Sequence, residues 1–149
     1  MKCVQCGHDG LKATTTALEV RIGDHLVRGS VPAEACPKCK EVYVDGRVHE
    51  RFELRVASDV ARSGNMSGES FRFMRKSLGF HAKALGELID TPPETISRWE
   101  TGSRPVDRFA WITLATMVID QAEARTPATR DVLRAVAKPK PFPKVVKVA

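Results

Sequence analysis

The arrangement of the four cysteines limits how this chain can fold more than any other feature, because all four lie in the first 40 residues. They form two pairs with the same spacing, Cys3 with Cys6 and Cys36 with Cys39. In a C-x2-C step the two thiolates of one tight turn reach the same ion, and two such steps complete a tetrahedral four-sulfur site. The pattern therefore predicts one Zn²⁺ per chain. Since four sulfurs leave no open position for water, we expect this ion to be structural.

The segment between the two cysteine pairs has room for a two-stranded hairpin. Residues 11–21 and 26–33 are typical of strands, and a Gly23-Asp24 turn joins them. Gly7, directly after the first pair, supplies the backbone freedom that such a metal-binding turn needs. This is the layout of a zinc ribbon. A segment of about 45 residues buries too little surface to fold alone, so the metal is expected to hold it together.

A second identity for the metal centre stays open. The paired form C-x2-C-G and C-P-x-C also resembles the iron-binding turns of rubredoxins, in which iron held by four cysteines carries one electron. Rubredoxins are acidic and rich in aromatic residues around the metal. Residues 1–57 contain only Tyr43 and Phe52 as aromatic residues and carry 9 basic against 8 acidic side chains. Zinc is therefore the first expectation and a rubredoxin-like iron centre the minor alternative.

The rest of the chain has helical periodicity, and the expected fold class is α+β. A helix over 48–62 follows a short β run at 42–44, and small residues at 64–68 form a linker. Further helices are expected at 69–78, 81–89, 91–102, 105–124 and 129–136. We thus predict a zinc-binding domain at 1–63, a linker at 64–68, an all-helical domain at 69–137 and a basic, Pro-rich tail at 138–149.

Composition and charge exclude several classes of protein. The longest stretch without a formal charge, 109–119, is eleven residues, whereas a membrane-spanning helix needs about 20. The N-terminus lacks the unbroken apolar region of a secretory signal. We expect a cytoplasmic protein without membrane contact. No nucleophile–base constellation, carboxylate pair or phosphate-binding Gly loop is present, so an enzyme is the least expected class.

Two segments resemble the Cro/repressor type of helix-turn-helix DNA-binding domain. They are Leu85-Gly86-Glu87-Leu88-Ile89 and Thr95-Ile96-Ser97-Arg98-Trp99-Glu100-Thr101-Gly102, and the resemblance covers about 69–120. A four-cysteine ribbon, a linker and this helix-turn-helix, in this order and size, resemble the MqsA-type antitoxins of bacterial toxin–antitoxin systems.

The resemblance implies a role for individual residues. It places Glu94, Ser97 and Arg98 at the major groove and turns Ile96 and Trp99 inward. We count Thr95 and Arg104 among the DNA-contacting residues, with Lys76 as a further phosphate contact, and the resemblance pairs Arg75 with Glu100 inside the fold. Ala82 stands where many repressors have a phosphate-binding glutamine. Thr91 is expected to cap the recognition helix, and Glu94 has the alternative role of completing a capping box with it.

The resemblance, taken with the cysteine pattern, implies a function. The chain is expected to be a zinc-containing transcriptional repressor that acts as an antitoxin, covers an endoribonuclease toxin and represses its own operon. Dimerisation through the apolar helix at 105–124 would let a homodimer read a palindromic operator in double-stranded DNA. The alternative is a stand-alone zinc-ribbon regulator without a toxin partner.

Charge is distributed unevenly along the chain, whose formal net charge is +6. Residues 58–125 carry 9 basic and 9 acidic side chains, so the expected DNA-binding domain is neutral. Residues 126–149 carry 6 basic side chains, including Arg130, Arg134 and Lys138, against 1 acidic side chain. This basic end either contacts phosphates or serves as a solubilising disordered tail.

Overall fold

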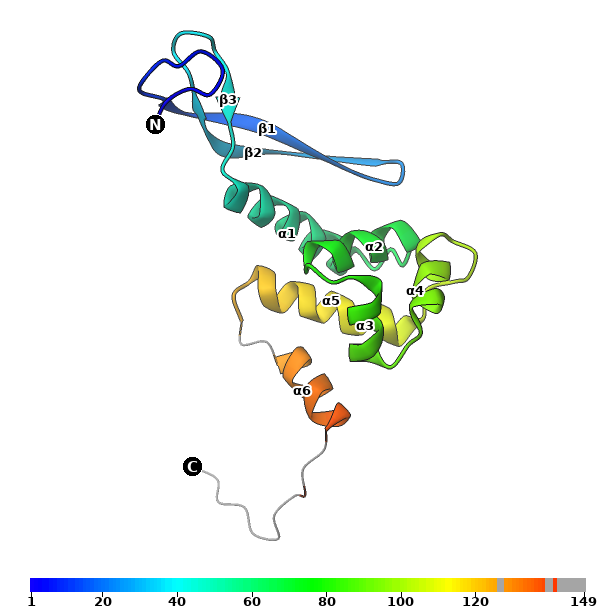
Figure 1. Cartoon of the computed structure of the whole chain (residues 1–149). Coiled ribbons are helices and arrows are strands. Elements are labelled where there is room, and N and C mark those ends of the chain that lie inside the picture. Colours follow the sequence, from blue (N-terminus) through cyan, green and yellow to red (C-terminus); the bar gives the residue numbers. More distant parts are fainter. Residues whose placement is uncertain (126–127, 139–140, 142–149) are drawn as a thin grey trace.

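The computed structural model describes residues 1–125, 128–138 and 141, and its fold is α+β, as predicted (Figure 1). An antiparallel three-stranded sheet occupies the N-terminal part, in the order β1-β2-β3. Six helices follow it within the described residues. The strands are β1 (Lys12–Ile22), β2 (His25–Ala35) and β3 (Val42–Tyr43). The helices are α1 (Gly46–Ser63), α2 (Gly68–Ser77), α3 (Ala82–Ile89), α4 (Pro93–Glu100), α5 (Arg108–Ala122) and α6 (Ala128–Ala137).

The β1–β2 hairpin is long and regular, with the register running from Lys12 opposite Ala35 to Ile22 opposite His25. A two-residue turn closes it, and Gly23 adopts φ 56° there, which a glycine accepts without strain. The hairpin lies over α1 (Figure 1). At Gly29 of β2 an added Cβ atom would stand 2.5 Å from the Phe52 ring of α1, so the close approach of helix and strand depends on this glycine.

Helix α1 packs on both parts of the molecule. Its Phe52 meets the hairpin, whereas Ala57 and Ala61 belong to the same buried core as Phe71 of α2 and Leu114 of α5. Asp45 caps its first turn by accepting a hydrogen bond from the Arg47 backbone N–H (2.8 Å). The helix assigned from sequence to the N-terminal domain therefore contributes side chains to the core of the helical part.

The apolar helix α5 is central to that core. Ala110, Trp111, Leu114 and Val118 are buried, and α1, α2 and α6 pack around the helix. The expectation that a helix apolar nearly all round must be covered on more than one side is confirmed. Phe109 and Ile112 remain exposed on its N-terminal half (76% and 45%).

The predicted N-cap at Thr91 is wrong. Helix α4 begins at Pro93, one residue after its N-cap Pro92, and no side chain caps it. The Thr91 hydroxyl instead donates to the Ile89 carbonyl (3.3 Å), and the Thr91 backbone N–H donates to the Gly86 carbonyl (2.9 Å). Because that N–H closes the end of α3, it is not free for the Glu94 carboxylate, and the capping box cannot form.

Two other expectations concern the ends of the helical part. Gly68, expected in the linker, is the first residue of α2, and Ser67 caps this helix by accepting from the Ser70 N–H (3.1 Å). The predicted tail at 138–149 lies outside the described residues except for Lys138 and Pro141. Over the described part of the chain, none of the helices combines the length and the apolar character needed to cross a bilayer.

Candidate metal centre and nucleic-acid interface

The two cysteine pairs come together at the end of the hairpin farthest from the helices (Figure 1). The Sγ atoms of Cys3, Cys6, Cys36 and Cys39 all lie within 4.8 Å of one another. The Cys3–Cys39 and Cys6–Cys36 Sγ distances are 3.5 Å and 3.6 Å. Four sulfurs placed about 2.3 Å from a tetrahedral zinc ion stand about 3.8 Å apart, whereas disulfide sulfurs stand about 2.05 Å apart. The spacing fits a four-thiolate metal site and does not fit disulfides.

The two cysteine turns share one backbone pattern. The Cys3 N–H donates to the His8 carbonyl, and the Gly7 N–H donates back to the Cys3 carbonyl, both at 2.9 Å. The second turn repeats this around Cys36, with Glu41 in the place of His8 and Lys40 in the place of Gly7, again at 2.9 Å. The position after each pair is left-handed, with φ 72° at Gly7 and φ 67° at Lys40. Gly7 thus uses the backbone freedom expected of it. Lys40 adopts the same left-handed conformation, at a greater cost in conformational free energy.

Three of the cysteine thiols have shifted pKa values, and the shifts differ in direction. The Tyr43 hydroxyl, 3.2 Å from the Cys3 Sγ, is the main cause that lowers the pKa of Cys3 to about 6. The pKa of Cys39 is raised to about 12, because burial and the three other thiols together outweigh the hydrogen bond from the Glu41 backbone. The Cys36 pKa is lowered, chiefly by hydrogen bonding to the Cys39 backbone. Four thiolates this close repel one another, and a bound divalent cation would supply the positive charge that neutralises them.

Tyr43 contacts the cysteine cluster, although sequence reasoning did not assign it to the site. It lies on β3, and its hydroxyl also accepts a hydrogen bond from the Gln5 backbone N–H (3.4 Å). The hydroxyl therefore links the second cysteine pair's strand to the first cysteine turn and orients the Cys3 sulfur. The sequence signal was only that Tyr43 is one of two aromatic residues in the N-terminal part.

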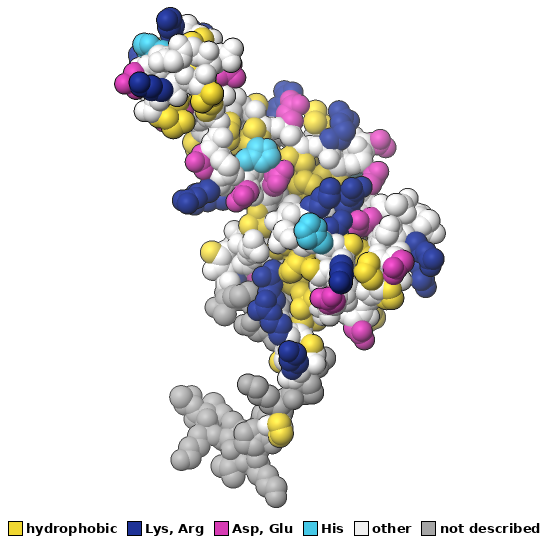
Figure 2. Space-filling view, viewed as in Figure 1, with side chains coloured by type: hydrophobic (Ala, Val, Ile, Leu, Met, Phe, Trp, Pro, Cys, Tyr) yellow, Lys and Arg dark blue, Asp and Glu magenta, His cyan; other side chains and the backbone are white. Residues whose placement is uncertain are grey.

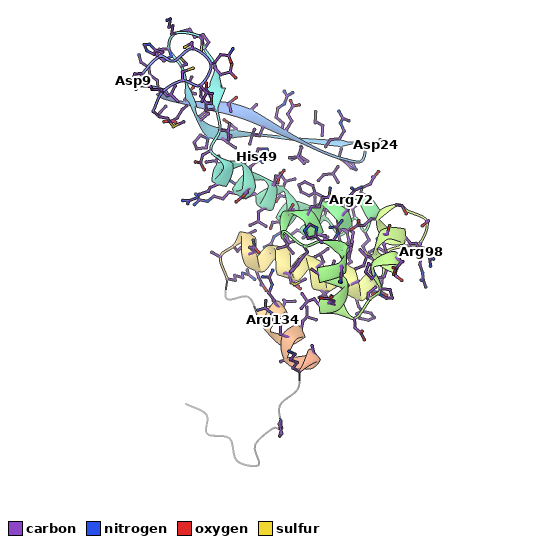
Figure 3. All side chains as sticks on the ribbon, viewed as in Figure 1. Asp9, Asp24, His49, Arg72, Arg98 and Arg134 are labelled. Carbon is purple, nitrogen blue, oxygen red and sulfur yellow. The ribbon has the colours of Figure 1, made fainter. Side chains whose placement is uncertain are left out.

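Helix α4 has one buried face and one exposed face. Ile96 is fully buried and Trp99 is 6% exposed, with its ring edge against Phe71 of α2 (ring centroids 5.6 Å apart, 78° between planes). Glu94, Ser97 and Arg98 are exposed, and Thr95 is half-buried. Figure 3 shows Arg98 pointing away from the body of the molecule. Within the described residues the Arg98 guanidinium has no hydrogen bond or ion pair, so it is available to a ligand.

A buried ion pair attaches the end of α4 to α2. The Arg75 guanidinium donates from Nε to Glu100 Oε1 (2.5 Å) and from Nη2 to Oε2 (3.0 Å). A third bond runs from its Nη1 to the Phe80 carbonyl (2.7 Å), and both side chains are 9% exposed. Arg75 and Glu100, paired by the resemblance, are thus partners in the structure. Their charges therefore neutralise each other inside the protein and are largely shielded from solvent.

Two glycines set how closely these helices approach. An added Cβ atom at Gly86 of α3 would stand 2.3 Å from the Thr91 carbonyl oxygen. At Gly68 of α2 it would stand 2.1 Å from the Trp99 carbonyl oxygen. The turn between α3 and α4, and the contact of α2 with the end of α4, therefore require glycine. Asp90 completes this turn in the left-handed region (φ 52°).

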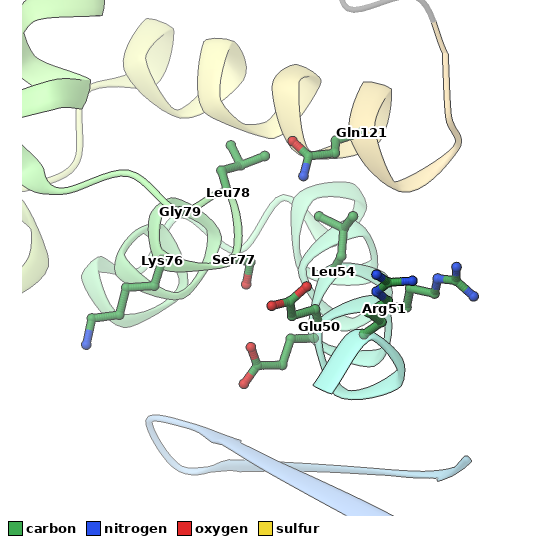
Figure 4. A pocket seen from close by; sticks show the side chains of 10 residues that line it. Glu50, Arg51, Leu54, Lys76, Ser77, Leu78, Gly79 and Gln121 are labelled. Atoms are coloured by element: carbon green, nitrogen blue, oxygen red, sulfur yellow. The ribbon is translucent and has the colours of Figure 1, made fainter. Parts of the chain in front are cut away.

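The remaining predicted phosphate contacts lie on different surfaces. Arg104 is exposed in the loop after α4, where its backbone N–H donates to the Arg98 carbonyl (3.1 Å). Lys76 lies at the mouth of a cavity of about 710 Å³ between α1, the end of α2 and Gln121 of α5 (Figure 4). Arginines and glutamates of α1 alternate around that cavity, so it presents no single charge to a ligand.

Comparisons of the chain with models of protein families, with curated proteins and with solved structures gave no match.

Proposed function

We propose that this chain is a zinc-containing, DNA-binding transcriptional repressor that acts as the antitoxin of a type II toxin–antitoxin pair. It neutralises a ribonuclease toxin and represses its own operon. The observation that carries the proposal is the division of α4 into a buried face, anchored by Ile96 and Trp99, and an exposed face that carries Arg98. A short helix held rigidly on one side and polar on the other suits the major groove.

The DNA-binding part works as a helix-turn-helix formed by α3 and α4. Arg98 binds guanine O6 and N7 in bidentate fashion, which is worth about 1–3 kcal/mol of base discrimination. Ser97 and Thr95 add hydrogen bonds, and Arg104 contacts a phosphate from the following loop. Glu94, released from the capping role, accepts from a cytosine amino group.

A homodimer brings two such helices to a palindromic operator. The exposed Phe109 and Ile112 of α5 support this arrangement, because apolar side chains of this size on one helix favour contact with a second copy. Two half-sites about one turn of DNA apart then match the two recognition helices.

The N-terminal part acts as a zinc ribbon that holds one structural Zn²⁺ per chain and binds the toxin. Strand β1 is the outer strand of the sheet, and its residues 13–18 carry no charge. An unprotected edge of this kind pairs readily with a strand of another protein. The toxin is accordingly expected to contact this edge and the adjoining face of α1.

The DNA-binding step is tested by a gel shift with a duplex taken from directly upstream of the chain's own reading frame. Arg98→Ala is expected to abolish the shift and to leave metal content and toxin binding unchanged, because the side chain is exposed. Arg47→Ala, which removes an exposed arginine of α1, is the control and should bind as the wild type does. Loss of folding in Arg98→Ala, or an unchanged shift, contradicts the proposed role.

The antitoxin step is tested by expressing the chain with its adjacent reading frame and measuring both the retained partner and the metal. A small protein retained together with about one zinc per chain supports the proposal. Zinc without a partner favours the stand-alone regulator. A red, iron-loaded preparation favours the rubredoxin-like alternative and removes the zinc ribbon from the proposal.

A further inference from the structure

Helix α6 carries a line of basic side chains that the proposed function does not use. Arg130, Arg134 and Lys138 follow one another at intervals of four residues, so they lie along one side of the helix. Lys138 stays in this register although it follows the last helical residue, because its backbone N–H donates to the Arg134 carbonyl (3.1 Å). Arg134 and Lys138 are both exposed.

Contacts with the rest of the molecule hold this line in a fixed position. The Thr129 hydroxyl donates to the Asp120 carboxylate of α5 (3.2 Å), and Leu133 packs against the main core. The Arg130 guanidinium stacks over the Phe80 ring, 4.9 Å from its centre, in the loop that leads into α3. Arg130 therefore ties α6 to the α2–α3 corner, while the two basic residues after it point into solvent.

Helix α6 supplies positive charge that the proposed DNA-binding part lacks. Residues 58–125 are neutral overall, yet a protein that binds duplex DNA must neutralise several phosphates. Figure 2 shows Lys and Arg side chains over α2, α4 and α6, with Asp and Glu side chains between them over the helical part. Figure 3, drawn from the same side, labels Arg72, Arg98 and Arg134 there. Helix α6 packs against α3, the helix that precedes α4 in the chain, and against α5.

We infer that Arg134 and Lys138, positioned by Arg130, contact the phosphates of the same DNA duplex that α4 reads. The inference rests on the proposed DNA-binding function and extends the DNA interface from the helix-turn-helix to α6. These contacts carry no sequence information, and they supply affinity and salt dependence. Arg98 supplies the discrimination between bases.

The test is the salt dependence of DNA binding by the full chain, measured by fluorescence anisotropy with the upstream duplex and with a shuffled duplex. The variant Arg134→Gln/Lys138→Gln leaves the stacked Arg130 in place. Since each lost phosphate contact removes about 0.9 from the slope of log affinity against log salt, the slope is expected to fall by about 1.8 on both duplexes. The advantage of the wild type over the variant then shrinks about twelvefold between about 50 and 200 mM salt.

Two further variants make the result specific. Arg47→Gln/Arg51→Gln removes the same charge from exposed positions of α1 and should leave the slope unchanged. Arg134→Lys/Lys138→Arg keeps the charges and should keep the wild-type slope. Circular dichroism of each variant checks that α6 is retained.

The outcomes separate the inference from the proposed function. Equal slopes for the α6 variant and the α1 control overturn the inference while specific binding through Arg98 persists. A wild-type chain that shows no preference for the upstream duplex overturns the proposed function and the inference with it. Tighter binding of the wild type to single-stranded RNA than to either duplex also refutes the assignment of α6 to DNA.

Discussion

Replacing Glu100 by glutamine tests how α4 is held against α2. The substitution keeps the size of the side chain and removes its charge, so the Arg75 guanidinium loses its counter-ion inside the protein. Of the three hydrogen bonds that Arg75 donates, the bond to the Phe80 carbonyl remains, and the glutamine oxygen can accept one more. The glutamine NH₂ group then faces an arginine N–H, and two donors oppose each other.

The expected cost follows from the burial of the pair, whose side chains are each 9% exposed. Removing one partner of a buried ion pair typically costs about 3–5 kcal/mol, because the remaining charge is left uncompensated. For a chain of this size each kcal/mol lowers the melting temperature by about 2–4 °C. Glu100→Gln should therefore melt at least about 6 °C below the wild type.

The assay is thermal unfolding followed by circular dichroism at 222 nm, with Glu94→Gln as the matched control. Glu94 lies on the same helix and is exposed, so its replacement should change the free energy of unfolding by no more than about 0.5 kcal/mol. The double variant Arg75→Met/Glu100→Leu replaces both charges by apolar groups and should recover much of the loss. A Glu100→Gln variant as stable as Glu94→Gln would refute the reasoning, since the pair would then contribute nothing to folding.

Two further pairs of substitutions test backbone geometry. Lys40→Gly should stabilise the metal-bound chain by up to about 1 kcal/mol because it removes a side chain from the left-handed region, whereas Gly7→Ala at the equivalent position should destabilise it. Metal-dependent melting curves measure both, and the same sign for both variants would contradict the shared turn geometry. Gly68→Ala should cost about 1–3 kcal/mol because its Cβ atom would overlap the Trp99 carbonyl, while Gly46→Ala, with open space around it, should be tolerated in the same chemical unfolding assay.

Local sequence rules predicted most elements to within a few residues. The helices expected at 69–78 and 81–89 begin or end one residue away from the observed α2 and α3. Strand β1 has the expected length and is shifted by one residue, whereas β2 begins one residue earlier and ends two residues later than expected. These elements are determined by periodicity and by Gly and Pro boundaries, which are local. The cysteine cluster was predictable for the same reason, because each C-x2-C turn is complete within six residues.

The cap at Thr91 could not be predicted in this way, because two local signals competed for one N–H group. A threonine three residues before Glu94 is typical of a capping box, and a residue after the left-handed Asp90 is typical of a helix end. The structure satisfies the second pattern, since the Thr91 N–H closes α3 on the Gly86 carbonyl. Whether the Thr91 N–H closes α3 or bonds to Glu94 depends on how closely α3 and α4 approach, and no local sequence rule predicts that distance.

The position of α1 shows a second kind of limit, which concerns the domain boundary. The stretch 64–68 has the composition of a linker, and helix α1 before it was therefore assigned to the metal-binding part. Two opposite faces of α1 are apolar, one with Phe52 towards the hairpin and one with Ala57 and Ala61 towards α5. Helical periodicity identifies an apolar face but not the partner that covers it. Because one rigid helix packs against both the hairpin and the helical core, a change that loosens α1 is expected to affect the two parts together.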